Sequence, residues 1–393
     1  MQYRKDNKSG NELSALGLGC MRFPQKSGRI DMEETERIIK NALERGINYF
    51  DTAYIYSGSE AALGSILHQN SLREKAYIAT KMPLFLCKKP SDFDKFFNTQ
   101  LERLKTDYID YYFMHMLTCP TQWEALKSMG VEKWLDEKKR EGKIKNIGFS
   151  FHGKKDDFTA LIDAYPWEFC MIQYNYCNIN YQAGMEGLKY AHSKGLPVIV
   201  MEPLLGGRLA DGLPPKAEEL FKKTNAALTP AAWALRWLWE QPEVTVVLSG
   251  MGSMAQLDEN VKTAEASSIG MLTADEREAY SQAIEIFNES YKIPCTGCNY
   301  CMPCPLGVNI PGCFSAYNSS YAIGKKTGMQ QYMTGTNITS KTPSYAGLCK
   351  KCGKCEKHCP QSIKVAEAMG EVKKRMEPLW FKVLASGAKR FVK

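Results

Sequence analysis

The chain has 393 residues, 44% of them hydrophobic, and a formal net charge of +8. This is longer than one average domain, and the apolar content is sufficient for a sizeable core. No run of eighteen apolar residues occurs and residues 1–10 are polar, which excludes a membrane-spanning helix and a secretion signal, so we expect a cytoplasmic protein with no membrane association.

Apolar, strand-like runs alternate with helical periodicity over the first two thirds of the chain. We expect strands at residues 15–20, 47–50, 77–80, 109–114, 144–149, 170–172, 198–201 and 244–248. We expect helices at residues 31–45, 60–68, 91–105, 123–140, 156–164, 182–194, from 229 onward and at 254–263. Strict alternation indicates an α/β fold with a parallel sheet, and eight units favour a (β/α)8 TIM barrel over residues 1–272. An open doubly wound sheet is the alternative, but the glycine spacing typical of its first turn is missing.

The remaining third has a different character. Thr273 and Glu276 are placed for a capping box, which predicts a linking helix over residues 273–290. Beyond it the chain is rich in Cys, Gly and Pro. We expect a loop at residues 320–345 and a short helix at 365–376.

Cysteine is concentrated in this last part. Nine of the fourteen cysteines lie between residues 295 and 359, which in a chain without a secretion signal favours metal over disulfides. Cys349-x-x-Cys352-x-x-Cys355-x-x-x-Cys359-Pro has the spacing of bacterial ferredoxins. The run Cys295-x-x-Cys298-x-x-Cys301-x-x-Cys304-Pro is one residue shorter. Two runs predict two [4Fe–4S] clusters, with zinc ribbons as the alternative.

The likeness to two-cluster ferredoxins implies how the cysteines are shared, because there the last cysteine of each run ligates the other cluster. One cluster would then be held by Cys295, Cys298, Cys301 and Cys359, and the other by Cys349, Cys352, Cys355 and Cys304. Cys313 is left over, and we expect it to be buried. Residues 291–393 are therefore predicted to form a small, mostly α/loop ferredoxin-type iron–sulfur domain.

Charge supports this interpretation. Residues 295–393 carry fifteen Lys/Arg and four Asp/Glu, a net charge of +11. Thiolate-bound clusters are anionic and would offset much of it. A nucleic-acid surface is the alternative, but no recognition motif accompanies the charge, so we expect no nucleic-acid partner.

Polar side chains end several predicted strands, and in a barrel such residues meet at one face. They are Asp51, Lys81, His115, Ser150, Gln173 and Glu202, with Tyr56 in the loop after Asp51. Taken singly, the lysine could be a solvated charge and the histidine a satisfied core residue. Together, a lysine would lower the pKa of a nearby phenol and an aspartate would hold the lysine, which makes the phenol a proton donor near neutral pH.

Asp51-Thr-Ala-x-x-Tyr56, Lys81, His115, Gln173-Tyr-Asn175 and the segment 247–260 resemble the aldo-keto reductase family, in the subgroup that carries a C-terminal two-cluster [4Fe–4S] ferredoxin-type domain. The resemblance implies reduction of a small-molecule aldehyde or ketone by NADP(H) or NAD(H). Tyr56 would be the general acid, Lys81 would tune it, Asp51 would anchor Lys81 and His115 would orient the carbonyl. The segment 247–260 would form the phosphate and adenosine site at the eighth strand and the helix after it. There Gly250 and Gly252 let backbone N–H groups approach a phosphate, and Lys262 is the nearest basic residue. The implied cofactor-binding residues are Ser150, Gln173, Glu202, Leu204, Ser249, Gly250, Met251, Gly252, Ser253, Gln256, Glu259 and Asn260.

A nicotinamide transfers two electrons at once, whereas iron–sulfur clusters transfer one. Three hypotheses therefore remain open. The clusters could be structural or redox-sensing beside an ordinary carbonyl reductase, or they could exchange electrons with an external carrier such as a ferredoxin or flavodoxin. Alternatively, the barrel could be a cofactor-binding or regulatory module without carbonyl reductase activity. Phe151 and Met201, which depart from the family pattern around the nicotinamide, keep this last hypothesis open.

Overall fold

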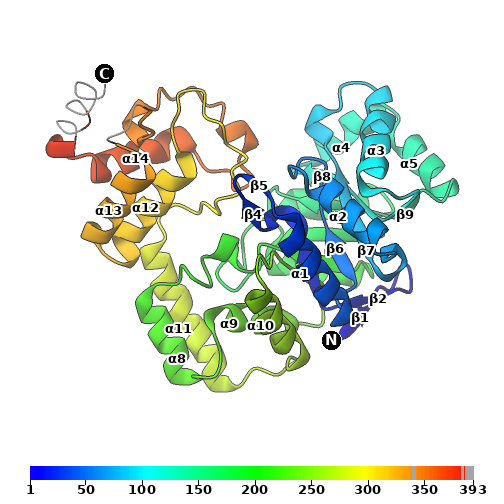
Figure 1. Ribbon diagram of the computed structural model, residues 1–393, viewed down its shortest axis with the longest axis horizontal. Helices are drawn as coiled ribbons and strands as arrows, with labels where there is room; N and C mark the ends of the chain where they lie inside the picture. Colours follow the sequence, from blue (N-terminus) through cyan, green and yellow to red (C-terminus); the bar gives the residue numbers. More distant parts are fainter. Residues whose placement is uncertain (339–341, 382–384, 386–393) are drawn as a thin grey trace. The chain divides into compact units, whose positions relative to one another are not determined.

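The computed structural model describes residues 1–338, 342–381 and 385. The chain divides into two compact units (Figure 1). The first contains Met1–Leu204 and Ala231–Leu272, and the second contains Leu205–Pro230 and Thr273–Lys393. The segment Leu205–Pro230, which the sequence analysis included in residues 1–272, thus packs with the second unit. No helix in the described ranges is long and apolar enough to cross a membrane.

The first unit is a closed barrel of eight parallel strands, which confirms the predicted fold. Its strands in chain order are β3 (Leu16–Gly19), β6 (Tyr49–Asp51), β7 (Tyr77–Met82), β8 (Ile109–Leu117), β9 (Ile144–Phe151), β10 (Phe169–Gln173), β11 (Val198–Met201) and β12 (Val244–Ser249). Strand β12 closes the barrel on β3, with Val247 opposite Leu16.

Helices follow the strands in the predicted order. They are α1 (Met32–Glu44), α2 (Ser59–Gln69), α3 (Ser91–Leu104), α4 (Pro120–Ser128), α5 (Val131–Arg140), α6 (Lys155–Asp163), α7 (Gly184–Ser193), α9 (Pro230–Trp239) and α10 (Met254–Glu265). The single helix expected at residues 123–140 is wrong, because Gly130 at φ 82° separates α4 from α5. Two small antiparallel pairs, β1 (Tyr3–Lys5) with β2 (Glu12–Ser14) and β4 (Gln25–Lys26) with β5 (Arg29–Ile30), were not expected.

Alternate strand residues fill the barrel interior. One buried cluster inside the barrel contains Tyr49, Ala79, Phe113 and Met171, each from a different strand. The hydrophobic residues next to these along each strand belong to the cluster that packs toward the helices. Since side chains alternate along a strand, the residue two positions further on faces the same side. In these four strands that residue is Asp51, Lys81, His115 and Gln173 in turn. The strand periodicity therefore directs all four side chains into the carboxyl end of the barrel.

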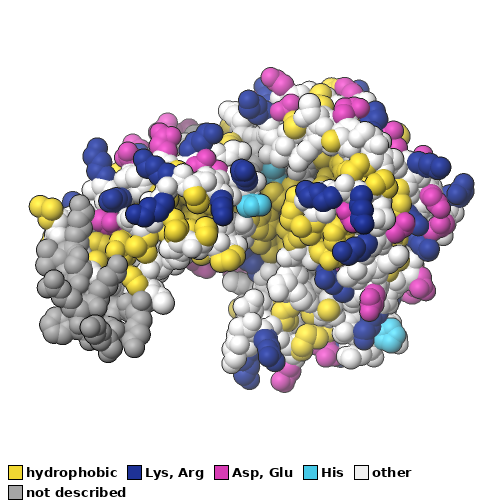
Figure 2. Space-filling model, turned by 90° about the horizontal axis from the view of Figure 1, so that it is seen from above, with side chains coloured by type: hydrophobic (Ala, Val, Ile, Leu, Met, Phe, Trp, Pro, Cys, Tyr) yellow, Lys and Arg dark blue, Asp and Glu magenta, His cyan; other side chains and the backbone are white. Residues whose placement is uncertain are grey.

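The second unit is mainly helical. Its helices are α8 (Pro215–Thr224), α11 (Ala274–Ser290), α12 (Ile310–Ala322), α13 (Lys325–Gly335) and α14 (Val365–Met376). Helix α11 begins with the predicted capping box of Thr273 and Glu276 and packs against α8. Figure 2 shows one face of the second unit, on which Lys and Arg side chains are scattered among acidic and apolar side chains.

The loop expected at residues 320–345 is wrong for most of its length, and residues 339–341 lie outside the described part of the chain. Helix α12 ends at Ala322, and α13 forms from a sequence rich in Gly, Thr and Gln. Tertiary packing overrides this weak propensity. Tyr332 on α13 is fully buried, donates a hydrogen bond to Glu377 at 2.7 Å and accepts one from the Ala346 N–H at 2.8 Å.

Candidate functional site

The carboxyl end of the barrel holds a buried ion pair. Lys81 Nζ lies 2.6 Å from Asp51 Oδ1 and 2.7 Å from the carbonyl oxygen of Thr52. Lys81 is 1% exposed and Asp51 is 4% exposed. Burial lowers the pKa of Lys81 and raises the pKa of Asp51, and their mutual attraction opposes both shifts. The charged pair is therefore held together by its own Coulomb attraction in a dry environment.

Tyr56 lies beside this pair. The Lys81 ammonium is 5.0 Å from the centroid of the Tyr56 ring, and the His115 ring is 6.3 Å away in an edge-on arrangement. Tyr56 is half-buried, in the loop between β6 and α2. The four predicted catalytic residues, which come from three different strands and one loop, thus lie close together.

His115 is buried at the same end of the barrel. Burial, assisted by the charge of Lys81, lowers the pKa of His115 well below its ordinary value. The imidazole is therefore neutral at neutral pH. Its Nδ1 atom is buried and has no hydrogen-bond partner in the part of the chain that the structure describes. A neutral, incompletely bonded imidazole can take part in a hydrogen bond to a bound polar molecule.

The predicted cofactor residues surround the same end of the barrel. Ser150 on β9 is buried and accepts a hydrogen bond from the Met116 N–H at 2.9 Å. Gln173 ends β10, and Glu202 and Leu204 follow β11 directly. The carbonyl oxygen of Glu202 accepts a hydrogen bond from Asn175 at 3.1 Å.

The predicted phosphate turn joins β12 to α10. Ser249 accepts a hydrogen bond from Asn260 at 2.9 Å, which ties the end of the strand to the helix. Ser253 caps α10 by accepting from the Gln256 N–H. The Gly252 N–H, expected to face a phosphate, instead donates to the Gln256 side chain at 2.9 Å. Of the other predicted residues in this turn, Gly250 is exposed, Met251 is buried and Glu259 is half-buried on α10.

One cation beside this turn was missed from the sequence. The Cβ and Cδ atoms of Arg22 lie 3.6 and 3.9 Å from the point that a Cβ on Gly250 would occupy. Arg22 follows the first barrel strand, more than 200 residues away in sequence, so only the closure of β12 on β3 brings the two together. From the sequence, Lys262 was the nearest basic residue expected for this turn.

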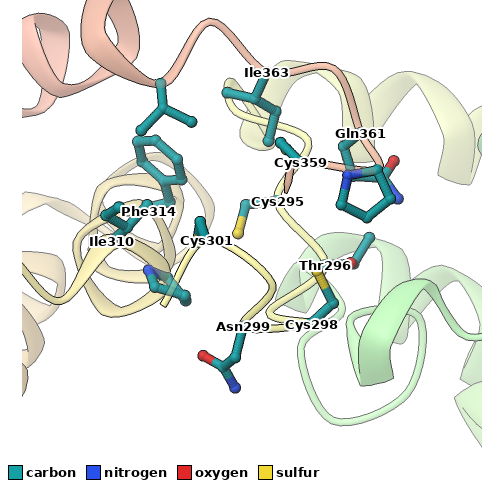
Figure 3. Close-up of a pocket in the computed structure, with 13 residues that line it drawn as sticks. Cys295, Thr296, Cys298, Asn299, Cys301, Ile310, Phe314, Cys359, Gln361 and Ile363 are labelled. Carbon is teal, nitrogen blue, oxygen red and sulfur yellow. The ribbon is translucent and has the colours of Figure 1, made fainter. Parts of the chain in front are cut away.

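In the second unit, four cysteines line one cavity of about 330 Å³, part of it open to solvent (Figure 3). They are Cys295, Cys298 and Cys301 of the first run and Cys359 from the end of the second. Ile310, Phe314 and Ile363 form its apolar wall. This is the crossed set that the likeness to two-cluster ferredoxins implied.

Three other cysteines of the second unit lie near one another. Burial raises the pKa of Cys355, and charge on Cys349 and Cys304 raises it further, so these three thiols are neighbours. Cys352 in the same run is exposed, and Cys313 is fully buried, as expected. Cys304 therefore lies with the second run, although its spacing is one residue short.

The thiols of the first group fit a cluster better than a single ion. Burial, and then charge on Cys295, Cys298 and Cys359, raises the pKa of Cys301 to about 12. Four thiolates so placed repel one another unless a cation lies between them. Among the described residues, no three His, Cys, Asp or Glu side chains are placed so that they could hold one metal ion. Tetrahedral zinc requires four sulfurs about 2.3 Å from one point, whereas a cluster takes one sulfur at each iron.

Comparison with known proteins agrees with both units. The model of the Aldo/keto reductase family matches residues 15–276, and the model of the 4Fe-4S dicluster domain matches residues 294–363. L-galactose dehydrogenase of Arabidopsis thaliana is 30% identical over 296 residues, which are 69% of this chain and 91% of that protein.

Solved structures match the barrel. An aldo-keto reductase from Bacillus halodurans in its holo form is 26% identical, with a TM-score of 0.59 over 72% of this chain and 96% of its own. One from Klebsiella pneumoniae in complex with NADPH is 22% identical, with a TM-score of 0.59 over 72% of this chain and 95% of its own, and shares the fold. The chain belongs to the aldo/keto reductase family and carries a 4Fe–4S dicluster domain after its barrel.

Proposed function

We propose that the chain reduces an aldehyde or ketone to an alcohol with a reduced nicotinamide cofactor, and that its second unit holds two [4Fe–4S] clusters. The observation that carries the proposal is the buried Lys81–Asp51 pair, 2.6 Å across, with its ammonium 5.0 Å from the Tyr56 ring. A buried ammonium favours the ionised form of a neighbouring phenol, so it promotes proton release by Tyr56.

In this reaction the cofactor supplies a hydride to the carbonyl carbon. Tyr56 gives its hydroxyl proton to the carbonyl oxygen, and water returns a proton to the phenolate afterwards. Lys81 stabilises the phenolate while it exists, and Asp51 keeps Lys81 charged. His115 donates a hydrogen bond that orients the carbonyl oxygen, and it does so as a neutral imidazole.

For the cofactor, we propose that Ser150 and Gln173 hold the carboxamide, with Glu202 and Leu204 beside it. The pyrophosphate and adenosine would contact Ser249, Gly250, Met251, Gly252, Ser253, Gln256, Glu259 and Asn260. Arg22 beside Gly250 adds a cation for a phosphate group. NADP(H) is favoured over NAD(H) by the relatives whose names or titles mention NADP(+) or NADPH.

For the clusters, we propose the two crossed ligand sets, Cys295, Cys298, Cys301 and Cys359 for the first and Cys349, Cys352, Cys355 and Cys304 for the second. The grouping of the thiols around one cavity supports the first set. The charge effects of Cys304 and Cys349 on Cys355 support the second.

The replacement Tyr56→Phe tests the carbonyl reductase proposal. We expect it to lower NADPH oxidation with simple aldehydes by at least about 100-fold, because general acid catalysis contributes roughly that much. Tyr54→Phe is the matched control, since Tyr54 is equally half-buried but packs against Phe96 and Arg103. Equal activity of the Tyr56→Phe and Tyr54→Phe proteins would show that Tyr56 is not the acid.

A second candidate function is electron exchange with an external carrier. It is favoured by the exposure of Cys352 and of three lysines in the same run, Lys350, Lys351 and Lys354, which would attract an acidic carrier such as a ferredoxin or flavodoxin. Reduction of the clusters by photoreduced flavodoxin should then slow as salt rises. A rate that does not depend on salt would argue against this surface.

A further inference from the structure

The first cluster site is contacted by a segment that begins immediately after Leu204. Gly206 in this segment has φ 69°, and a Cβ on it would lie 2.1 Å from the carbonyl oxygen of Thr296. Only glycine permits so close an approach of two backbones. The segment therefore packs directly on the loop that carries Cys295 and Cys298.

Arg208 in the same segment reaches Cys295. Its Nε donates a hydrogen bond to the carbonyl oxygen of Cys295 at 2.6 Å. The Arg208 side chain also lies within hydrogen-bonding reach of the Cys295 thiol. A half-buried guanidinium is thus fixed beside one of the four thiols that line the cavity.

Neighbouring aromatic rings hold Arg208 in this position. Its guanidinium carbon lies 5.1 Å from the centroid of the Tyr291 ring, and Tyr291 stacks on Phe287 at 4.2 Å. The Tyr291 hydroxyl donates to the carbonyl oxygen of Gly212 at 2.9 Å, which ties the end of the segment to the same ring. The cation is therefore pre-positioned, so its field acts on the site without a rearrangement.

We propose that Arg208 is a positioning residue that raises the reduction potential of the first cluster. This rests on the ligand set proposed above. A [4Fe–4S] core with four thiolates carries a net charge of −2, and uptake of one electron makes it −3. A fixed positive charge stabilises the more negative state, and a half-buried site screens this interaction less than water does. In the chain, Arg208 lies four residues after the proposed cofactor residue Leu204.

The test is an anaerobic redox titration with dithionite and mediators, followed by EPR, on the full-length protein with reconstituted clusters. In Arg208→Gln we expect one of the two cluster potentials to fall and the other to keep its wild-type value. Arg375→Gln is the matched control. Arg375 lies in the same unit and likewise contacts a tyrosine, with its guanidinium carbon 3.8 Å from the Tyr321 ring, and donates to the carbonyl oxygen of Ser320 at 3.0 Å. It should leave both potentials unchanged.

Arg208→Lys separates charge from shape, because it keeps the cation and loses the guanidinium fork. We expect the cluster potential of Arg208→Lys to lie nearer the wild-type value than that of Arg208→Gln.

An unchanged potential in Arg208→Gln, or an equal shift in Arg375→Gln or Arg208→Lys, would overturn the proposal. If Arg208→Gln does not retain the first cluster, Arg208→Lys decides. Retention with a near wild-type potential supports the role of charge, and loss of the cluster refutes it. If the wild-type protein does not give two EPR signals, the proposed ligand sets are wrong, whatever the role of Arg208. The redox titration does not depend on aldehyde reduction, so its result is independent of the proposed reaction.

Discussion

The replacement Lys81→Met removes the cation from the most buried ion pair of the barrel. Asp51 is only 4% exposed, and the replacement removes the partner of its Oδ1 atom at 2.6 Å. Its Oδ2 atom already lacks a hydrogen bond to any described residue. Removal of one member of a buried pair costs about 3–5 kcal/mol, because the remaining charge is uncompensated. We expect a loss of this size in the free energy of unfolding of the barrel at neutral pH.

Urea unfolding followed by tryptophan fluorescence measures this loss, since six of the seven tryptophans lie in the barrel. Lys138→Met is the control, because Lys138 pairs at 3.1 Å with Asp94, whose side chain is 51% exposed. An ion pair screened by water in this way contributes at most about 1 kcal/mol. The double variant Lys81→Met/Asp51→Leu should recover most of the lost stability while remaining inactive, because a well-packed apolar pair replaces a buried ionic one at little cost.

The loss should depend on pH in a defined direction. Without Lys81, burial is left as the dominant cause acting on Asp51, and it raises the pKa of Asp51 in the folded state above its unfolded value. A group with a raised folded pKa contributes full stability below its unfolded pKa and loses that contribution as pH rises. The deficit of Lys81→Met should therefore be largest at neutral pH and shrink in acid. A deficit below about 1 kcal/mol at pH 7, or no recovery in the double variant, would refute the role assigned to the pair.

Three further predictions concern other parts of the chain. Gly206→Ala places a Cβ 2.1 Å from the Thr296 carbonyl oxygen, so it should increase the rate at which a chelator removes iron. Gly207→Ala is the control, because nothing lies within 4 Å of a Cβ there. Equal rates in the two variants would contradict the close packing of Gly206 on Thr296. Cys359→Ala should remove about half of the bound iron and Cys313→Ala none, because Cys359 lines the cavity of the first thiol group and Cys313 does not. Analysis of the iron and sulfide content measures both effects, and equal losses would contradict the ligand assignment. Burial lowers the pKa of His115 in the folded state, so the unfolded state takes up a proton first and stability should fall as pH drops below about 6.5. His115→Gln should flatten this slope in urea titrations, and an unchanged slope would place its cause elsewhere.

The barrel, and the close grouping of its candidate catalytic side chains, could be predicted because both follow from local pattern. Period-two alternation places Asp51, Lys81 and His115 on the inward side of their strands, and parallel strands bring their carboxyl ends together. Cysteine spacing likewise predicts clusters directly, since the ligands of one run are close in sequence.

The rest depends on contacts between residues far apart in the chain. Arg208 reaches Cys295 from 87 positions away, and nothing in either local sequence indicates the contact. Arg22 meets the phosphate turn only because the barrel closes. Helix α13 was predicted as a loop because propensity alone is weak there, and the buried hydrogen bonds of Tyr332 stabilise it instead.

If the barrel catalyses the proposed reaction, a hydride passes from the nicotinamide to the carbonyl carbon without an intermediate carrier, and isotope labelling can follow that hydrogen. The protein with both clusters in place would be incubated anaerobically with an aldehyde and NADPH dideuterated at the nicotinamide C4, and the alcohol would be analysed by mass spectrometry. Direct transfer predicts one deuterium at the carbinol carbon in each product molecule, at a rate that Tyr56→Phe lowers and Tyr54→Phe does not. Alcohol formed without deuterium would mean that the hydride does not pass directly from the nicotinamide to the carbonyl carbon, which would contradict the proposed reaction.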